Sequence, residues 1–243
     1  MGKVSPLGTV PMMFDSFASS ATDLFGLALG WLAFGALHSL LASLRCKALV
    51  ARLWPGSERY YRLIYNLIAT VLLLPLLWAT LTWPGPWLWR WQGAVGLLMD
   101  ALALAALILL TRSGYDLAEF TGLSALRQPP RADTEPCPDR GEAFRLSPLH
   151  RHVRHPWYAL ALVLIWTRDM NAPLLVSSLA VTLYFIVGAQ LEEKKLLLRF
   201  GSVYAEYRQR VPALLPIPWR RLSASEAEAL LRRADGRSSL PAA

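Results

Sequence analysis

Two polar clusters near the C-terminal end of this chain hold the side chains best suited to chemistry. Residues 154–158 read Arg-His-Pro-Trp-Tyr, and a hydrophobic stretch separates them from the carboxylate pair Glu192-Glu193. A guanidinium, an imidazole and the free N–H groups of a helix start attract an anion, while paired carboxylates attract a cation. Together the clusters predict a site for a ligand that carries both a carboxylate and an ammonium group, as the head of an amino acid does.

The clusters lie in a largely hydrophobic chain. Its 243 residues are 54% hydrophobic, which is high for a soluble domain. Five apolar stretches occur at residues 24–44, 63–83, 91–111, 156–167 and 172–191. A membrane-spanning helix needs about 20 such residues. The sequence therefore predicts an all-α polytopic membrane protein with five transmembrane helices.

The cationic residues predict the orientation of these helices. Three segments, at 45–62, at 112–154 and after 191, carry five, seven and ten of the 25 Lys and Arg residues. Five spans place all three segments on one side, which the positive-inside rule makes cytoplasmic. We therefore expect a protein of the bacterial inner membrane with its N-terminus outside and its C-terminus in the cytoplasm. The net charge of +8 then reflects topology and contact with the lipid bilayer, and no nucleic acid is expected as a partner.

The predicted spans divide the chain into five parts. We expect an external N-terminal tail over residues 1–22 and three transmembrane helices over 23–111. A cytoplasmic loop covers 112–153, a binding hairpin with an amphipathic helix covers 154–215, and a cytoplasmic tail covers 216–243.

The amphipathic helix is predicted to continue the fifth span along the cytoplasmic surface of the membrane. The apolar residues that recur in it at helical spacing are Leu196, Phe200, Tyr204, Tyr207 and Val211. The tail that follows is expected to be solvated, with a short helix over residues 223–233.

The fourth apolar stretch is unusually short. Pro156 to Thr167 is 12 residues, or about 18 Å of helix, whereas the hydrocarbon core is about 30 Å thick. Either this helix begins upstream, or its start at Pro156 lies below the membrane surface in a cavity lined by protein. We favour the cavity, in which the free N–H groups of the helix start attract anions.

Residues 149–212 resemble the isoprenylcysteine carboxyl methyltransferase and phospholipid methyltransferase superfamily of integral-membrane enzymes. The resemblance lies in Arg-His-Pro-x-Tyr at 154–158, Glu-Glu at 192–193 and Phe-Gly-x-x-Tyr-x-x-Tyr at 200–207. It implies S-adenosylmethionine as the methyl donor and a lipophilic acceptor that enters from the bilayer. The cofactor-binding residues that it implies are His155, Pro156, Tyr158, Glu192, Glu193, Tyr204 and Tyr207. Arg154 would orient the acceptor or the carboxylate of the cofactor.

Three shorter runs, at residues 38–43, 59–63 and 116–128, are similar to the methanethiol S-methyltransferase and NnrU-like branch of these proteins. This similarity implies a small or lipophilic acceptor, with a thiol as first choice. The alternatives are carboxyl or amine methylation, as in the isoprenylcysteine and phospholipid enzymes, and a non-catalytic NnrU-like accessory protein. No metal is required for methyl transfer from a sulfonium.

His38 is the candidate base for a thiol acceptor. It lies near the cytoplasmic end of the first predicted span, where an ionisable side chain is costly unless it faces other helices. An imidazole there could remove the proton of a thiol, and the thiolate is the nucleophile. A structural histidine that is hydrogen-bonded to a neighbouring helix explains the residue equally well.

Overall fold

The computed structural model describes residues 13–83, 85–113, 121, 123 and 144–238. Most of the predicted tail over 1–22 and of the predicted loop over 112–153 therefore lies outside the described residues. The sequence similarity at 116–128 falls almost wholly in the same undescribed part.

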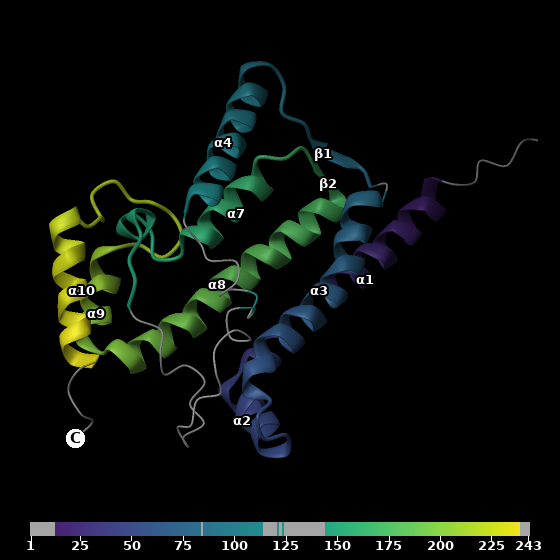
Figure 1. Cartoon of the computed structure of the whole chain (residues 1–243). Coiled ribbons are helices and arrows are strands. Elements are labelled where there is room, and N and C mark those ends of the chain that lie inside the picture. The colour runs from purple at the N-terminus through teal and green to yellow at the C-terminus, as the bar shows by residue number, and fades with distance from the viewer. Residues whose placement is uncertain (1–12, 84, 114–120, 122, 124–143, 239–243) are drawn as a thin grey trace, which may run out of the picture.

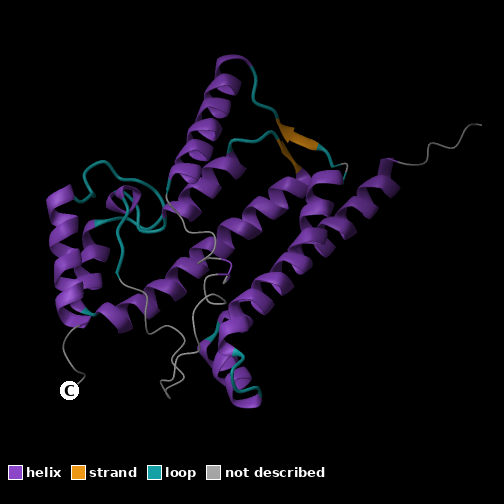
Figure 2. Ribbon diagram, in the orientation of Figure 1, coloured by secondary structure: helices purple, strands orange, loops and turns teal. Residues whose placement is uncertain are grey.

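Helices make up most of the described chain (Figure 2). The long helices are α1 (Met13–Ala42), α3 (Glu58–Thr82), α4 (Gly93–Arg112) and α8 (Ala172–Phe200). The shorter elements are α2 (Leu44–Leu53), a 3-10 helix η1 (Pro148–Arg151), α7 (Pro156–Trp166), α9 (Ser202–Arg210) and α10 (Ala224–Ser238). Two short strands, β1 (Trp87–Trp89) and β2 (Met170–Asn171), pair antiparallel.

Within the part of the chain that the structure describes, four helices are long and apolar enough to cross a membrane. These are Ala21–Ala42 within α1, Tyr60–Thr82 within α3, and the whole of α4 and α8. Leucines on their outer faces are exposed, as Leu81 on α3 and Leu97 on α4 illustrate. So much exposed apolar surface fits a lipid environment. The predicted helical character is confirmed, and four of the five predicted spans coincide with helices of membrane-crossing length and hydropathy.

The helix of the fourth apolar stretch, α7, has only 11 residues. A turn at Thr167 follows it, and then β2 pairs with β1, matching Asn171 with Trp87 and Met170 with Trp89. The N–H of Ala172 also donates to the carbonyl of Pro86 at 3.1 Å. Backbone groups that are paired in this way tolerate an apolar surrounding without a helix. β2 thus links α7 to α8 with its backbone groups paired.

Helices α1, α3 and α8 lie together as a bundle, and α7 lies beside α4 (Figure 1). Polar side chains join the three bundle helices: Trp31 Nε1 donates to Ser177 Oγ at 2.8 Å, and Thr80 Oγ1 lies 2.6 Å from the same oxygen. In a membrane, an apolar side chain gains little by packing against protein instead of lipid. Hydrogen bonds between buried polar side chains therefore help to hold the helices together.

The chain beyond Glu192 differs from the single amphipathic helix that we predicted. Helix α8 continues to Phe200, Gly201 then turns the chain with a φ of 54°, and α9 starts as a separate helix. The apolar face of α9, including Tyr204 and Tyr207, is buried against Phe144 and α10. We call α9, α10 and the residues packed on them the C-terminal module.

The short helix predicted in the tail is present and longer, as α10. Its inner face is covered, because Leu222 just before it and Leu230 within it are almost fully buried. Ala227, Leu230 and Ala234 recur at helical spacing and form that face. Residues 224–234 are therefore part of a packed core and are not solvated on all sides.

Gly201 offers a test of this turn. Its φ of 54° and ψ of −127° belong to a region that side chains other than glycine rarely enter, and forcing them there costs about 1–3 kcal/mol. We expect Gly201→Ala to lower the thermal unfolding midpoint of the purified protein. Gly26→Ala is the matched control, because an added Cβ there meets nothing within 4 Å. Equal midpoints for both variants would contradict the strained turn.

Candidate functional site

An ion-paired cluster forms where the start of α7 meets the end of the apolar part of α8. Arg154 Nε donates to Glu193 Oε1 at 2.8 Å, and Arg154 Nη2 lies 2.6 Å from the same oxygen. The second oxygen, Oε2, lies 3.1 Å from Nε of Arg208 on α9. The side chains of Arg154 and Glu193 are only 8% and 7% exposed. A buried carboxylate between two guanidiniums is well compensated, and removing one partner of such a cluster is costly.

The remaining donors of Arg154 are also engaged. Its Nη1 donates to the backbone carbonyls of Arg208 and Val211, just before the loop that joins α9 to α10. The guanidinium therefore ties α7, α8 and α9 together. This geometry suits a residue that positions the site, and it leaves Arg154 little capacity to orient a ligand directly.

His155 lies between the two carboxylates that the sequence singled out. Its Nε2 is 3.2 Å from Glu193 Oε1, and its Nδ1 is 3.6 Å from Glu192 Oε2. His155 is buried, whereas half of the Glu192 side chain is exposed. Glu192 is thus the carboxylate of the pair that a ligand can reach, and Glu193 is the one that holds the cations.

Backbone hydrogen bonds fix the start of α7. The N–H groups of Arg154 and His155 donate to the carbonyls of Pro212 and Ala213 at 2.9 and 3.0 Å. Pro156 then occupies the first turn of α7, where its missing N–H costs nothing. The buried helix start fits the protein-lined recess that the short apolar stretch predicted.

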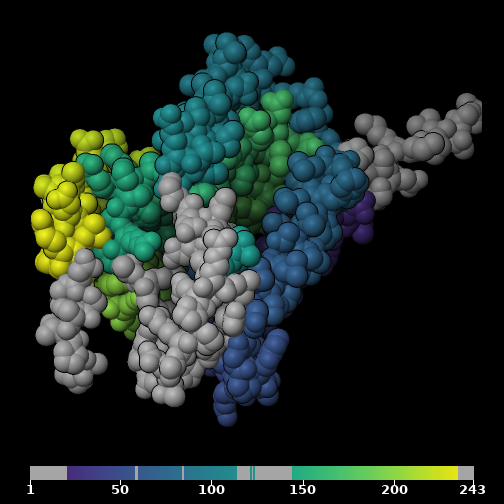
Figure 3. Space-filling model, viewed as in Figure 1, coloured from purple at the N-terminus to yellow at the C-terminus, as the bar shows by residue number. Residues whose placement is uncertain are grey.

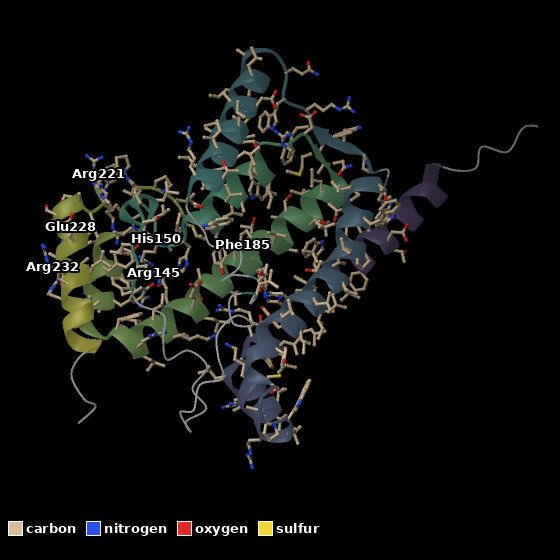
Figure 4. The ribbon with its side chains drawn as sticks, viewed as in Figure 1. Arg145, His150, Phe185, Arg221, Glu228 and Arg232 are labelled. Carbon is tan, nitrogen blue, oxygen red and sulfur yellow. The ribbon has the colours of Figure 1, made fainter. Side chains whose placement is uncertain are left out.

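A stack of aromatic rings leads from this cluster into the bundle. The rings of His155 and Tyr158 are stacked at 5.5 Å, and those of Tyr158 and Phe185 at 4.6 Å. Figure 4 shows Phe185 on α8, well inside the outline of the molecule. Gly188 lies below this stack, and a Cβ there would be 3.9 Å from the Tyr158 hydroxyl. The contacts with His155 and Phe185 therefore define the orientation of the Tyr158 ring.

The structure places Tyr204 and Tyr207 in the core of the C-terminal module. The Tyr207 hydroxyl donates to the carbonyl of His150 at 2.7 Å, and both rings contact Phe144. Burial raises the pKa of the Tyr204 hydroxyl, and the negative charge of Glu193 raises it further. Tyr204 and Tyr207 therefore contribute to the packing that holds the ion-paired cluster in place. Tyr158, which lies outside this core, is then the tyrosine that can stack against a ligand.

His38 lies in a second cluster, within the bundle. Its Nε2 is hydrogen-bonded to the Tyr65 hydroxyl, and its ring meets those of Phe34 and Tyr184 at 5.5 Å each. Its Nδ1 is buried, with no hydrogen-bond partner among the described residues. Tyr184 is adjacent to Phe185, so the aromatic stack connects this second cluster to His155. The sequence named His38 but gave no sign of its neighbours Tyr65 and Tyr184.

Arg208 is the other functional candidate that the sequence missed. It follows Tyr204 by one helical turn, and in the predicted amphipathic helix it belonged to the polar face. Only the turn at Gly201 brings that face back onto α8, where Arg208 reaches Glu193. Among the residues that the structure describes, no group of three His, Cys, Asp or Glu side chains could hold a metal ion.

His150 makes the module sensitive to acid. The N–H of Ser147 donates to His150 Nδ1 at 3.2 Å, which requires that nitrogen to be unprotonated. Burial, reinforced by nearby His155, lowers the pKa of His150 from 6.5 to about 4. The unfolded chain therefore binds a proton that the folded state does not, and the stabilising effect of neutral His150 is complete only above pH 6.5.

We expect the contact between η1 and α9 to weaken as the pH falls from 6.5 toward 4. Amide hydrogen exchange over residues 147–153 and 203–211 would measure this loss of stability, which the lowered pKa of His150 puts at up to about 3 kcal/mol at pH 4. His150→Asn is the control, because its amide oxygen can replace Nδ1 and does not titrate. If the variant and the wild type show the same pH dependence, His150 is not the responsible group.

Comparison with known proteins identifies one family and several curated relatives. The profile of the family described as NnrU protein matches residues 26–193. Methanethiol S-methyltransferase 2 of Bradyrhizobium diazoefficiens is 33% identical over 186 residues, which are 75% of this chain and 69% of that protein. A methanethiol S-methyltransferase of a Pseudomonas species is 31% identical, over 75% of this chain and 69% of that protein. The one from Mycobacterium tuberculosis is 33% identical, over 77% of this chain and 75% of that protein. No solved structure matches the chain significantly.

Proposed function

The chain belongs to the NnrU protein family, and we propose that it is an integral-membrane methyltransferase that uses S-adenosylmethionine to methylate a small thiol. The observation that carries the proposal is the buried cluster of Arg154, His155 and Glu193, within the motifs that resemble the methyl-donor site of the isoprenylcysteine carboxyl methyltransferase superfamily. The curated relatives named as methanethiol S-methyltransferases support the choice of a thiol.

The cluster fits the amino-acid head of S-adenosylmethionine. Half-exposed Glu192 would pair with the ammonium group, and His155 at the start of α7 would face the carboxylate. The face of Tyr158 would attract the sulfonium. Glu193, Arg154 and Arg208 then act as positioning residues, since their charges already compensate one another. Pro156, Tyr204 and Tyr207 support the site through the backbone and the module core.

The cluster around His38 supplies the acceptor side. When bound, S-adenosylmethionine provides an electrophilic methyl group on its sulfonium. His38 would take the proton of the thiol on Nδ1, which leaves the thiolate as nucleophile. The Tyr65 hydroxyl accepts from Nε2–H in that state and holds the ring in place. The aromatic walls formed by Phe34 and Tyr184 exclude water around the thiolate and suit a small apolar acceptor.

We also propose five crossings of the membrane, with the N-terminus outside and the site in the cytoplasm. Helix α7 and the turn and short strand over residues 167–171 together make the fourth crossing. The charge pattern supports this arrangement, because the cations of α2 and of the C-terminal module then lie on the same side. The tryptophans of β1 mark the opposite interface.

Two measurements test the proposal. Calorimetric titration of the purified protein with S-adenosylhomocysteine is expected to show binding that Glu192→Gln weakens and Glu228→Gln, at an exposed position of α10, does not. Feeding methanethiol to cells that express the protein should then release dimethyl sulfide into the headspace. Failure of the wild type to bind S-adenosylhomocysteine would overturn the methyltransferase. Binding without dimethyl sulfide would overturn only the thiol acceptor.

A further inference from the structure

The loop between α9 and α10 exposes apolar side chains that do not pack in the core of the C-terminal module. Leu215 is 75% exposed and Trp219 is 83% exposed, although both lie outside the membrane-spanning helices. Arg220 and Arg221 follow directly. We call these four residues the loop surface. It lies beyond residues 26–193, the part of the chain that matches the family.

The loop surface is held at the depth where the chain enters the membrane. The first residues of the loop, Pro212 and Ala213, accept hydrogen bonds from Arg154 and His155, immediately before the apolar helix α7 begins. Figure 1 shows the loop arching from the module toward that helix start. Glu193, which pairs with the same residues, follows directly on the apolar stretch of α8. The loop therefore lies at the boundary between the apolar helices and water.

The loop is also fixed in shape. Leu222 and Arg151 are joined twice, because Leu222 N–H donates to the Arg151 carbonyl and Arg151 Nε donates to the Leu222 carbonyl, both at 3.0 Å. Arg220 donates through Nη2 to the Gln209 carbonyl at 2.6 Å. Pro216 and Pro218 restrict the stretch between these ties. The exposure of Leu215 and Trp219 is therefore a stable feature of the fold.

The charges around the loop surface select for anions. A hollow beside it is lined by Arg151, Trp219 and Arg221, and its carboxylate, Glu226, is ion-paired with Arg210. Figure 4 shows Arg221 at the outer edge of the module, and Figure 3 shows that the α10 side of the module lies apart from α1 and α3. Tryptophan prefers the headgroup region of a bilayer, and each arginine near an anionic surface adds attraction.

From these observations we propose that the loop surface docks on the anionic lipid headgroups of the leaflet that borders the methyl-donor site. Leu215 and Trp219 enter the interface, and exposed Arg221 faces the phosphates. Because the same loop accepts the backbone hydrogen bonds of Arg154 and His155, docking also holds the start of α7 in place. The membrane thereby stabilises the site through a loop that lies outside the membrane-spanning helices.

Depth-dependent quenching tests this docking in the full chain. A fluorophore is attached at Leu215→Cys, in a background with Cys46→Ser and Cys137→Ser, and the protein is placed in nanodiscs that contain lipids with a quencher near the headgroup. A label at Glu228→Cys, which Figure 4 shows on the outer face of α10, is the control. We expect quenching several-fold stronger at 215 than at 228. Equal quenching at the two positions would overturn the proposal.

The lipid charge provides the second measurement. Replacing anionic by zwitterionic lipid should reduce the quenching at 215, and so should Arg221→Gln in anionic nanodiscs. The ratio of docked to undocked loop is expected to fall about fivefold for that single arginine. Quenching that is unaffected by both changes would contradict recognition of anionic headgroups. Circular dichroism shows whether each variant is folded, and none of these readouts depends on methyltransferase activity.

Discussion

Glu193→Gln is expected to abolish detectable binding of S-adenosylhomocysteine. The substitution keeps the shape of the side chain but leaves the guanidinium of Arg154 buried without a compensating charge. Removing one partner of a buried ion pair costs about 3–5 kcal/mol in stability. We expect the loss in binding free energy to be about 2–5 kcal/mol, which corresponds to about 30-fold or more in affinity. Calorimetric titration measures the affinity, and thermal unfolding measures the stability of the same sample.

The two carboxylates of the pair should respond differently. Glu192→Gln removes the half-exposed carboxylate that we propose pairs with the ammonium group of the ligand, so we expect weaker binding with an unchanged unfolding midpoint. Glu193→Gln should lower both. Arg208→Gln, whose side chain is 51% exposed, should give a smaller version of the Glu193 effect. Wild-type affinity in Glu193→Gln would show that the ion-paired cluster does not build the site.

The second large effect is expected at His38. His38→Gln removes the proposed base but keeps a polar side chain, and loss of a general base lowers kcat by about 100- to 10,000-fold. Affinity for S-adenosylhomocysteine should stay at the wild-type value, because His155 and Glu192 are untouched. Dimethyl sulfide release by the purified protein, with methanethiol and S-adenosylmethionine supplied, measures the rate.

A structural histidine would behave differently from a base. If His38 removes the thiol proton, the activity of His38→Gln should rise with pH as the free thiol ionises in solution. Tyr65→Phe is the companion variant: it takes away the hydrogen bond to Nε2 and should lower the rate less than His38→Gln. A rate that falls equally at every pH, together with a lower unfolding midpoint, would assign His38 to packing.

Much of the site could be predicted from the sequence, because its residues come from two short motifs. Arg154, His155 and Tyr158 are neighbours in the chain, and a hairpin returns Glu192 and Glu193 to the same end of the bundle. The sequence could not predict that Glu193 is buried in ion pairs whereas Glu192 is half exposed. Glu193 faces inward only because α9 folds back at Gly201 and brings Arg208 and the Val211 carbonyl around Arg154.

Composition and charge pattern alone determined that this chain is helical and apolar enough for a membrane, since these properties depend only on which residues follow one another. The tertiary structure decided three further points. It brought His38 next to Tyr65 and Tyr184, followed the short helix α7 with a strand that pairs with β1, and turned the expected surface helix into a packed module. Each of these depends on contacts between residues far apart in the chain, where the geometry of packing determines the neighbours and local spacing carries no information.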